Sequence, residues 1–249
     1  MGAVSQYDVR FLCDIVEKYR PKNVFELGVA SGMSSSFLLR ALARVSSDCK
    51  LFSVDLGTQY YVDRSKLVGY LIDEIVPVKE CEFEIHRGCW AGDAEKIIGD
   101  DRLDLIFIDA NHMHPWPTID TVLLLPFANP NAIIAHHDIA LWEKEGREHG
   151  IGPFHIFDEF PEPKFISQCK HRNIGAFQIT QPLANYEPIL LKAMHRDWTI
   201  SNAIRTDMFN QIVDFVEKYY SADFCKQFVS NLEENNTVVR EKMVQKKSA

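Results

Sequence analysis

The stretch Val24-Phe25-Glu26-Leu27-Gly28-Val29-Ala30-Ser31-Gly32 decides the fold class of this chain. It is an apolar run that contains one acid, followed by two glycines four residues apart. A second apolar run, at 51–54, ends on Asp55. A glycine turn after a first strand lets the backbone approach a ligand closely, and an acid at the end of the second strand can hold a ribose. The two stretches predict a nucleotide-type cofactor site in an open α/β sheet, which indicates an enzyme.

Apolar runs alternate with helical spacings along the first part of the chain. We expect strands at 23–28, 51–56, 83–86, 103–109 and 132–138, and helices over 4–19, through 38–45 and over 67–75. Nearly continuous apolar strands separated by helices predict a parallel sheet covered on both faces. The runs 164–168 and 174–179 are joined by a turn too short for a crossover helix, so they should pair antiparallel. The expected fold is a doubly wound, mostly parallel, seven-stranded α/β sheet with an antiparallel C-terminal strand pair.

The C-terminal part of the chain has a helical pattern. Apolar residues share one helical face at positions 204, 208, 212, 215 and 219, and the last dozen residues are polar, so we expect that end to fray. No internal repeat or linker interrupts the sequence. We therefore predict one domain over 1–185, including the N-terminal helix, and a helical extension over 186–249 that packs on the same domain.

Charge and composition exclude several classes of protein. The net charge of −8 and the pI near 5.6 argue against a nucleic-acid partner. No apolar run approaches the roughly 20 residues that cross a bilayer, and the polar N-terminus does not resemble a secretory signal. Six scattered cysteines without a C-x-x-C pair predict neither a zinc site nor a disulfide framework: Cys13, Cys49, Cys81, Cys89, Cys169 and Cys225. We expect reduced cysteines in a cytoplasmic protein.

The assembled motifs resemble the class I S-adenosylmethionine-dependent methyltransferases over roughly residues 5–180. The matching residues are Glu26, Gly28, Gly32, Asp55, the Ile-Asp-Ala-Asn-His run at 108–112 and the His-His-Asp-Ile run at 136–139. An acid at the end of the fourth strand, followed three residues later by histidine, is similar to the macrolide-sugar and related small-molecule O-methyltransferases. The resemblance implies a Rossmann-like methyltransferase fold and S-adenosylmethionine as the cofactor.

The resemblance also implies which residues contact the cofactor. Gly28, Ser31 and Gly32 would wrap its methionine and ribose part, and Glu26 would lie beneath it and order the loop. Asp55 would accept hydrogen bonds from both ribose hydroxyls.

Two further positions complete the expected cofactor site. Trp90, or the neighbouring Cys89, falls just past the third strand, where such folds contact adenine, although Trp90 could equally pack against a helix. Asp109, at the end of the fourth strand, is expected to contribute to cofactor binding as well as to catalysis.

Methyl transfer to an alcohol needs a positioned base or a metal that lowers the hydroxyl pKa. Asp109 and Asp138 end adjacent parallel strands, so their carboxylates can converge at the carboxyl edge of the sheet. His112 could take the acceptor proton. The alternatives are that Asp138 caps a helix and that His112, His114, His136 and His137 line a polar rim.

The predicted metal ligands are Asp109, His137 and Asp138. Carboxylates suit Mg²⁺, but the metal-using sugar enzymes that the chain resembles have Glu where this chain has His137. Because histidine is a softer ligand, the sequence leaves open Mg²⁺, another divalent metal, or none.

The leading interpretation is O-methylation of a small hydroxylated acceptor, with sugars favoured. A nicotinamide-dependent oxidoreductase is the alternative enzyme, but the loop lacks the G-x-G-x-x-G spacing. A non-catalytic cofactor-binding scaffold is the alternative from another class. We expect a small-molecule partner, no nucleic acid and no membrane, and the sequence leaves open whether the chain forms a homo-oligomer.

Overall fold

The computed structural model describes residues 4–168 and 172–248, which form two compact units. The first, called the sheet unit, comprises Met1–Ala110, Phe127–His137 and Glu162–Thr180. The second, called the helical unit, comprises Asn111–Pro126, Asp138–Pro161 and Gln181–Ala249. The segments of the two units alternate along the chain, and the predicted boundary after residue 185 lies inside the helical unit.

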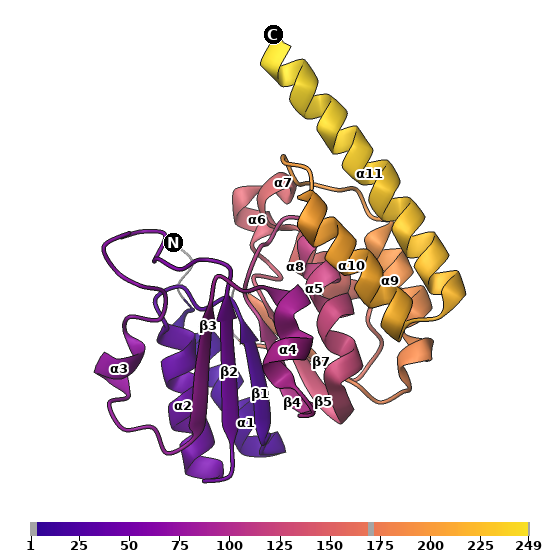
Figure 1. Cartoon of the computed structure of the whole chain (residues 1–249). Helices are drawn as coiled ribbons and strands as arrows, with labels where there is room; N and C mark the ends of the chain where they lie inside the picture. The colour runs from indigo at the N-terminus through magenta and orange to yellow at the C-terminus, as the bar shows by residue number, and fades with distance from the viewer. Residues whose placement is uncertain (1–3, 169–171, 249) are drawn as a thin grey trace. The chain divides into compact units, whose positions relative to one another are not determined.

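The sheet unit is built on a seven-stranded sheet with the order β3-β2-β1-β4-β5-β7-β6 (Figure 1). The strands are β1 (Asn23–Leu27), β2 (Lys50–Asp55), β3 (Glu82–Arg87), β4 (Leu103–Ile108), β5 (Ala128–His137), β6 (Lys164–Ile166) and β7 (Ile174–Gln178). The first five run parallel, and β7 is antiparallel to both β5 and β6. The predicted fold class and the antiparallel pair are confirmed.

The strand register places the candidate site at one edge of the sheet. Leu27 at the end of β1 pairs with Val54 of β2 and with Ile108 of β4. Parallel strands in register end together, so the segments that follow β1, β2 and β4 emerge at the same edge. The central strands β1, β2 and β4 are held by apolar side chains that are almost completely buried on both faces, as a covered parallel sheet requires.

Helices of the sheet unit cover both faces of this sheet. They are α1 (Gln6–Tyr19), α2 (Met33–Val45), α3 (Ile72–Ile75), the 3-10 turn η1 (Ala91–Asp93) and α4 (Ala94–Ile98). Figure 1 shows α1 and α2 behind the strands and α4 in front of them. Ser5 and Asp8 form a capping box that starts α1, which ends at Arg20 in the left-handed conformation before Pro21.

The predicted helix over 67–75 is wrong, because only its last turn, α3, forms. Gly69 adopts a φ of +75° and interrupts the helical pattern. Its N–H donates to the Ala30 carbonyl (2.8 Å), and the Leu71 N–H donates to the Ser31 carbonyl (3.0 Å). The backbone N–H groups of Gly69 and Leu71 therefore bond to the glycine loop after β1 and not to carbonyls of a continuous helix.

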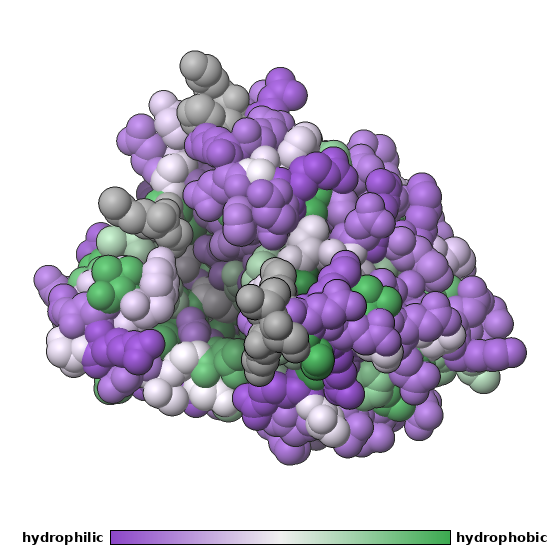
Figure 2. Space-filling view, turned by 90° about the horizontal axis from the view of Figure 1, so that it is seen from above, coloured by the Kyte–Doolittle hydropathy of each residue, from purple (hydrophilic) through white to green (hydrophobic). Residues whose placement is uncertain are grey.

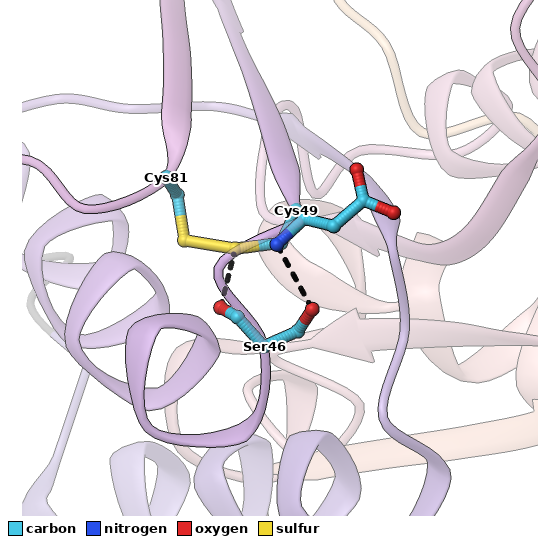
Figure 3. Close-up of a disulfide and its surroundings, with 4 residues drawn as sticks. Ser46, Cys49 and Cys81 are labelled. Atoms are coloured by element: carbon cyan, nitrogen blue, oxygen red, sulfur yellow. Dashed lines mark hydrogen bonds between the residues drawn. A yellow bond between two sulfur atoms is a disulfide. The ribbon is translucent and has the colours of Figure 1, made fainter.

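The prediction of unpaired cysteines is also wrong, because Cys49 and Cys81 form a disulfide (Figure 3). Each cysteine precedes a strand, and the next residues, Lys50 and Glu82, are direct partners in the β2–β3 register. Strand pairing thus brings together two cysteines that are 32 residues apart. Among the described residues, Cys13, Cys89 and Cys225 are free, and Cys169 lies outside them.

The helical unit contains α5 (Trp116–Leu124), α6 (Trp142–Glu145), α7 (Arg147–Gly150), α8 (Gly152–Glu159), the 3-10 turn η3 (Leu183–Asn185), α9 (Glu187–Met194), α10 (Thr206–Tyr219) and α11 (Ala222–Ser248), and the 3-10 turn η2 (Leu125–Phe127) follows α5. Helix α5 contacts α8, α9 and α10, and α11 contacts α9 and α10. The Tyr220 hydroxyl, buried, donates to the Val122 carbonyl at 2.6 Å. Helix α11 continues to Ser248, and the predicted fraying of the C-terminal end stays a prediction.

None of the helices in the described part of the chain is both long and apolar enough to cross a membrane.

We expect the double change Cys49→Ser and Cys81→Ser to lower the free energy of unfolding by roughly 4 kcal/mol, because the disulfide joins residues that are 32 positions apart in the unfolded chain. Urea titration without reductant measures the change, with Cys225→Ser as the control that removes a free thiol. Equal unfolding midpoints for the double variant and the native protein would contradict a stabilising disulfide.

Candidate cofactor and catalytic site

The loop between β1 and α2 contains two positions that accept only glycine. Gly28 has a φ of +95°, and a Cβ there would lie 2.0 Å from the Asp109 carbonyl oxygen. Gly32 has a φ of +89°, and a Cβ there would lie 2.5 Å from Cγ1 of Ile72. The loop is therefore pressed against the end of β4 on one side and against α3 on the other. Ser31 lies between these glycines at the start of α2, where unpaired backbone N–H groups attract polar ligands.

Asp55 at the end of β2 holds this loop in place. Its Oδ2 accepts hydrogen bonds from the backbone N–H groups of Val29 (2.9 Å) and Ala30 (3.0 Å). Its Oδ1 accepts from the Gly57 N–H (2.7 Å). A carboxylate offers about four acceptor positions, so three are in use and roughly one is left for a ribose hydroxyl. The expected contact with both ribose hydroxyls would require one of these loop bonds to give way.

Glu26 lies beneath the loop with none of its surface exposed. Its carboxylate accepts hydrogen bonds from the hydroxyls of Ser34 (2.5 Å), Ser35 (2.5 Å) and Ser53 (2.6 Å). Two of these serines open α2, so Glu26 ties the start of that helix to β1 and β2. Burial raises the pKa of Glu26 to about 7. The hydrogen bonds from the three serine hydroxyls lower this pKa, and the nearby charge of Asp109 raises it further.

Trp90 follows β3 and is only 8% exposed. The Asp93 carboxylate accepts from the Trp90 N–H (3.2 Å), and the preceding residue, Cys89, donates its N–H to the Asp55 carbonyl (3.1 Å). This segment is thus fixed to the end of β2. The burial of the Trp90 ring favours a packing role, and its contact with adenine stays a prediction.

A row of three polar side chains, two of them buried and Asp109 partly buried, lies within the sheet unit. Nδ1 of His137, at the end of β5, is 3.2 Å from Oδ1 of Asp109, and Nε2 is 3.3 Å from Oδ2 of Asp8. The side chains of Asp8 and His137 are each only 3% exposed. Burial favours a raised pKa for Asp8, but hydrogen bonds from His137 and Ser5 outweigh it and the pKa is lowered. Sequence reasoning missed Asp8, because nothing local links the start of α1 to the end of β5.

His112 and Asp138 contact each other within the helical unit. Nε2 of His112 is 3.0 Å from Oδ2 of Asp138, with side chains 25% and 8% exposed. The His112 carbonyl accepts from the Gly152 N–H at 2.9 Å, which fixes the backbone at this position. Sequence analysis singled out both residues but did not predict that they pair. The predicted convergence of Asp109 with Asp138 joins residues of different units and stays a prediction.

The other two histidines of the predicted cluster are buried and do not form a polar rim. His136 stacks on Phe177, with 5.9 Å between ring centroids, and burial lowers its pKa to about 3. In the helical unit the ring of His114 lies 4.9 Å from that of His155. Burial lowers the pKa of these two to about 3 and about 4. All three are neutral at physiological pH and serve packing.

The raised pKa of Glu26 predicts a pH-dependent stability. The pKa is about 4.5 in the unfolded chain and about 7 in the folded protein, so ionisation of Glu26 removes stability as the pH rises from 4.5 to 7. The shift corresponds to about 3 kcal/mol. We expect Glu26→Gln to gain free energy of unfolding relative to the native protein across that range, measured by denaturant titration at several pH values. Parallel stability profiles for the two proteins would refute the shift.

Comparison with known proteins agrees with this geometry. Residues 25–139 match the model of a family described as a methyltransferase domain. No curated protein matches the chain significantly in sequence. Three solved structures share its fold, and each of these matches covers 72% of this chain. The share of the other chain that is covered is given last for each. The three structures are the O-methyltransferase TomG from Streptomyces achromogenes in complex with SAM (18% identity, TM-score 0.54, 82% of that chain), an O-methyltransferase from Bacillus cereus in complex with SAH (18%, 0.52, 83%) and the SAH-bound Podospora anserina methyltransferase PaMTH1 (14%, 0.56, 81%).

The family match spans the glycine loop, Asp55, Trp90, Asp109, His112 and the end of β5, and the structures just named share the overall fold. The expected class I, Rossmann-like methyltransferase fold is therefore confirmed, and residues 25–139 are similar to a methyltransferase domain.

Proposed function

We propose that this methyltransferase uses S-adenosylmethionine to methylate a hydroxyl group of a small acceptor, in the first place a sugar. The observation that carries the proposal is the contact between His112 and Asp138, a base held by a carboxylate. Such a pair is what an O-directed enzyme needs, because an alcohol is a poor nucleophile until its proton is removed.

The sheet unit supplies the residues proposed for the cofactor. Gly28, Ser31 and Gly32 form a tight loop that a ligand can approach closely, and Asp55 fixes that loop while keeping room for a ribose hydroxyl. Two of the similar structures, TomG and the Bacillus cereus enzyme, are complexes with SAM and SAH. Glu26 is fully buried, so its proposed role is to order the loop from beneath.

The proposed reaction is a direct displacement. The acceptor oxygen attacks the methyl carbon, the bond from that carbon to the sulfonium sulfur breaks, and the sulfur keeps the electron pair as a thioether. His112 takes the hydroxyl proton, and the Asp138 carboxylate stabilises the imidazolium that forms. Alignment of oxygen, carbon and sulfur contributes the rest of the rate.

The donor set around His137 fits a divalent metal. Nδ1 of His137 and Oδ1 of Asp109 lie 3.2 Å apart, the separation of two ligands that are each about 2.0–2.2 Å from one ion. An imidazole beside a carboxylate suits zinc or another transition metal better than Mg²⁺, which prefers oxygen ligands. Asp138, which follows His137 directly in the chain, is the proposed third ligand. When bound, such an ion would lower the pKa of the acceptor hydroxyl.

We expect S-adenosylhomocysteine to raise the melting temperature of the protein, whereas NAD⁺ and NADH leave it unchanged. A ligand at about a hundredfold excess over its dissociation constant stabilises the folded state by about 2.7 kcal/mol. Differential scanning fluorimetry measures the shift. Stabilisation by the dinucleotide alone would favour the oxidoreductase instead.

We expect His112→Ala to lower the rate of methyl transfer by about a hundredfold to ten-thousandfold, the usual contribution of a positioned base. Its affinity for S-adenosylhomocysteine should stay unchanged, because the base acts on the acceptor. Release of S-adenosylhomocysteine, measured with a panel of sugars, reports the rate, and calorimetry reports the affinity. The control variant His195→Ala changes an exposed histidine at the C-terminal end of α9, and we expect it to be fully active.

Treatment with a chelator separates the two ways of activating the acceptor. Activity that survives chelation in the native protein but is lost in His112→Ala indicates base catalysis without a metal. Activity that is lost on chelation and returns with a divalent ion indicates the metal-assisted route. Full activity of His112→Ala would refute the proposed base.

A further inference from the structure

The carboxylate of Asp8 lies on the far side of the His137 ring from Asp109. Asp8 belongs to the first turn of α1, and its Oδ2 is 3.3 Å from Nε2 of His137. Both side chains are almost completely buried, so neither can exchange its partner for solvent. The family comparison and the sequence motifs assign no role to this position.

Asp8 is held where it stands by the capping box of α1. The Ser5 hydroxyl (2.6 Å) and the Ser5 backbone N–H (2.9 Å) both donate to Oδ2, the oxygen that faces His137. Helix α1 in turn packs on α2 and on the sheet. The position of the carboxylate is therefore fixed by a helix end, and the imidazole must adapt to it.

The two carboxylates impose an arrangement on the imidazole. A neutral histidine has one N–H and one lone pair, and an ionised carboxylate only accepts hydrogen bonds. With the N–H directed at Asp8, the lone pair of Nδ1 faces Asp109, which is also an acceptor. Two acceptors 3.2 Å apart repel each other unless a proton or a metal ion lies between them. A metal ion bound there would have Nδ1 of His137 and Oδ1 of Asp109 as two of its ligands.

We propose that Asp8 is a positioning residue that directs Nδ1 of His137 toward a divalent ion shared with Asp109, an inference that rests on the metal site of the proposed function. When the second nitrogen of a metal-binding histidine donates a hydrogen bond to a carboxylate, the bond fixes the orientation of the ring and makes the histidine a stronger ligand. The N-terminal helix thereby becomes part of the metal site, although none of its residues contacts the ion.

Binding of Co²⁺ alone tests the proposal without any need for the acceptor. The visible absorption of Co²⁺ reports its coordination, and titration gives the affinity of the native protein, Asp8→Asn, Ser5→Ala and Asp109→Asn. We expect Asp8→Asn to weaken Co²⁺ binding by about tenfold to a hundredfold, the usual effect of changing such an outer partner. Asp109→Asn should weaken it further, because that residue is a proposed ligand.

Ser5→Ala is the matched control. It removes the side-chain cap of α1, which costs about 1 kcal/mol of stability, but leaves the backbone N–H of residue 5, which donates to Oδ2 of Asp8 and holds that carboxylate beside His137. We expect its Co²⁺ affinity and absorption spectrum to equal those of the native protein. If Ser5→Ala loses as much affinity as Asp8→Asn, the role of Asp8 is only to cap the helix, and the proposal is overturned.

Two other results would also overturn it: equal Co²⁺ affinity in Asp8→Asn and the native protein, or a native protein that binds no Co²⁺. Calorimetry on the same samples measures the binding of S-adenosylhomocysteine, so that a failure of the metal-site proposal can be distinguished from a failure of the proposed function. A protein that binds S-adenosylhomocysteine but no Co²⁺ refutes the role of Asp8 and leaves methyl transfer by His112 standing. A protein that binds Co²⁺ as expected but no S-adenosylhomocysteine refutes the proposed cofactor alone.

Discussion

The close approach of Gly28 to the backbone of Asp109 is the constraint on which the rest of the candidate site depends. The Gly28 N–H donates to the Val54 carbonyl of β2 (2.8 Å), and the Asp109 N–H donates to the Leu27 carbonyl of β1 (2.8 Å). The loop after β1 therefore leaves the sheet between two strand ends that are already hydrogen-bonded to it. Any side chain at position 28 would push β4 away from β1 and displace Asp109, and with it the contact to His137.

The buried acids of the sheet unit differ in acidity because their partners differ. Burial opposes ionisation of both Glu26 and Asp8. Glu26 has only neutral serine hydroxyls as partners and has Asp109 nearby, so burial prevails and its pKa rises to about 7. Asp8 has His137 and two donors from Ser5, and these prevail over burial. A charged Asp8 can direct an imidazole N–H, whereas Glu26 is suited to holding hydroxyls beneath a loop.

The sequence predicted those features that arise from neighbouring residues. The strand runs, both glycines and Asp55 each carry a local signal, and all of them have the predicted structural setting. The features that sequence reasoning missed depend on the register of distant segments. Cys49 meets Cys81 only because β2 pairs with β3, and Asp8 meets His137 only because α1 packs near the end of β5. Residues 67–71 read as a helix because their apolar spacing is helical, yet Gly69 bends that segment toward the glycine loop.

Strand parity decides which of the two consecutive histidines of β5 can take part in chemistry. Successive side chains of a strand point to opposite faces of the sheet. His136 points to the face where Phe177 stacks on it, and burial lowers its pKa so that the ring is neutral. His137 points the other way, where Asp8 and Asp109 both approach its nitrogens. A shift of β5 by one residue would exchange these environments, placing His136 between the acids and His137 against Phe177. The pairing of β5 with β4 and β7 therefore selects the histidine that can act as a ligand, and the chemistry of this edge is fixed by hydrogen bonds of the sheet as much as by the identity of its side chains.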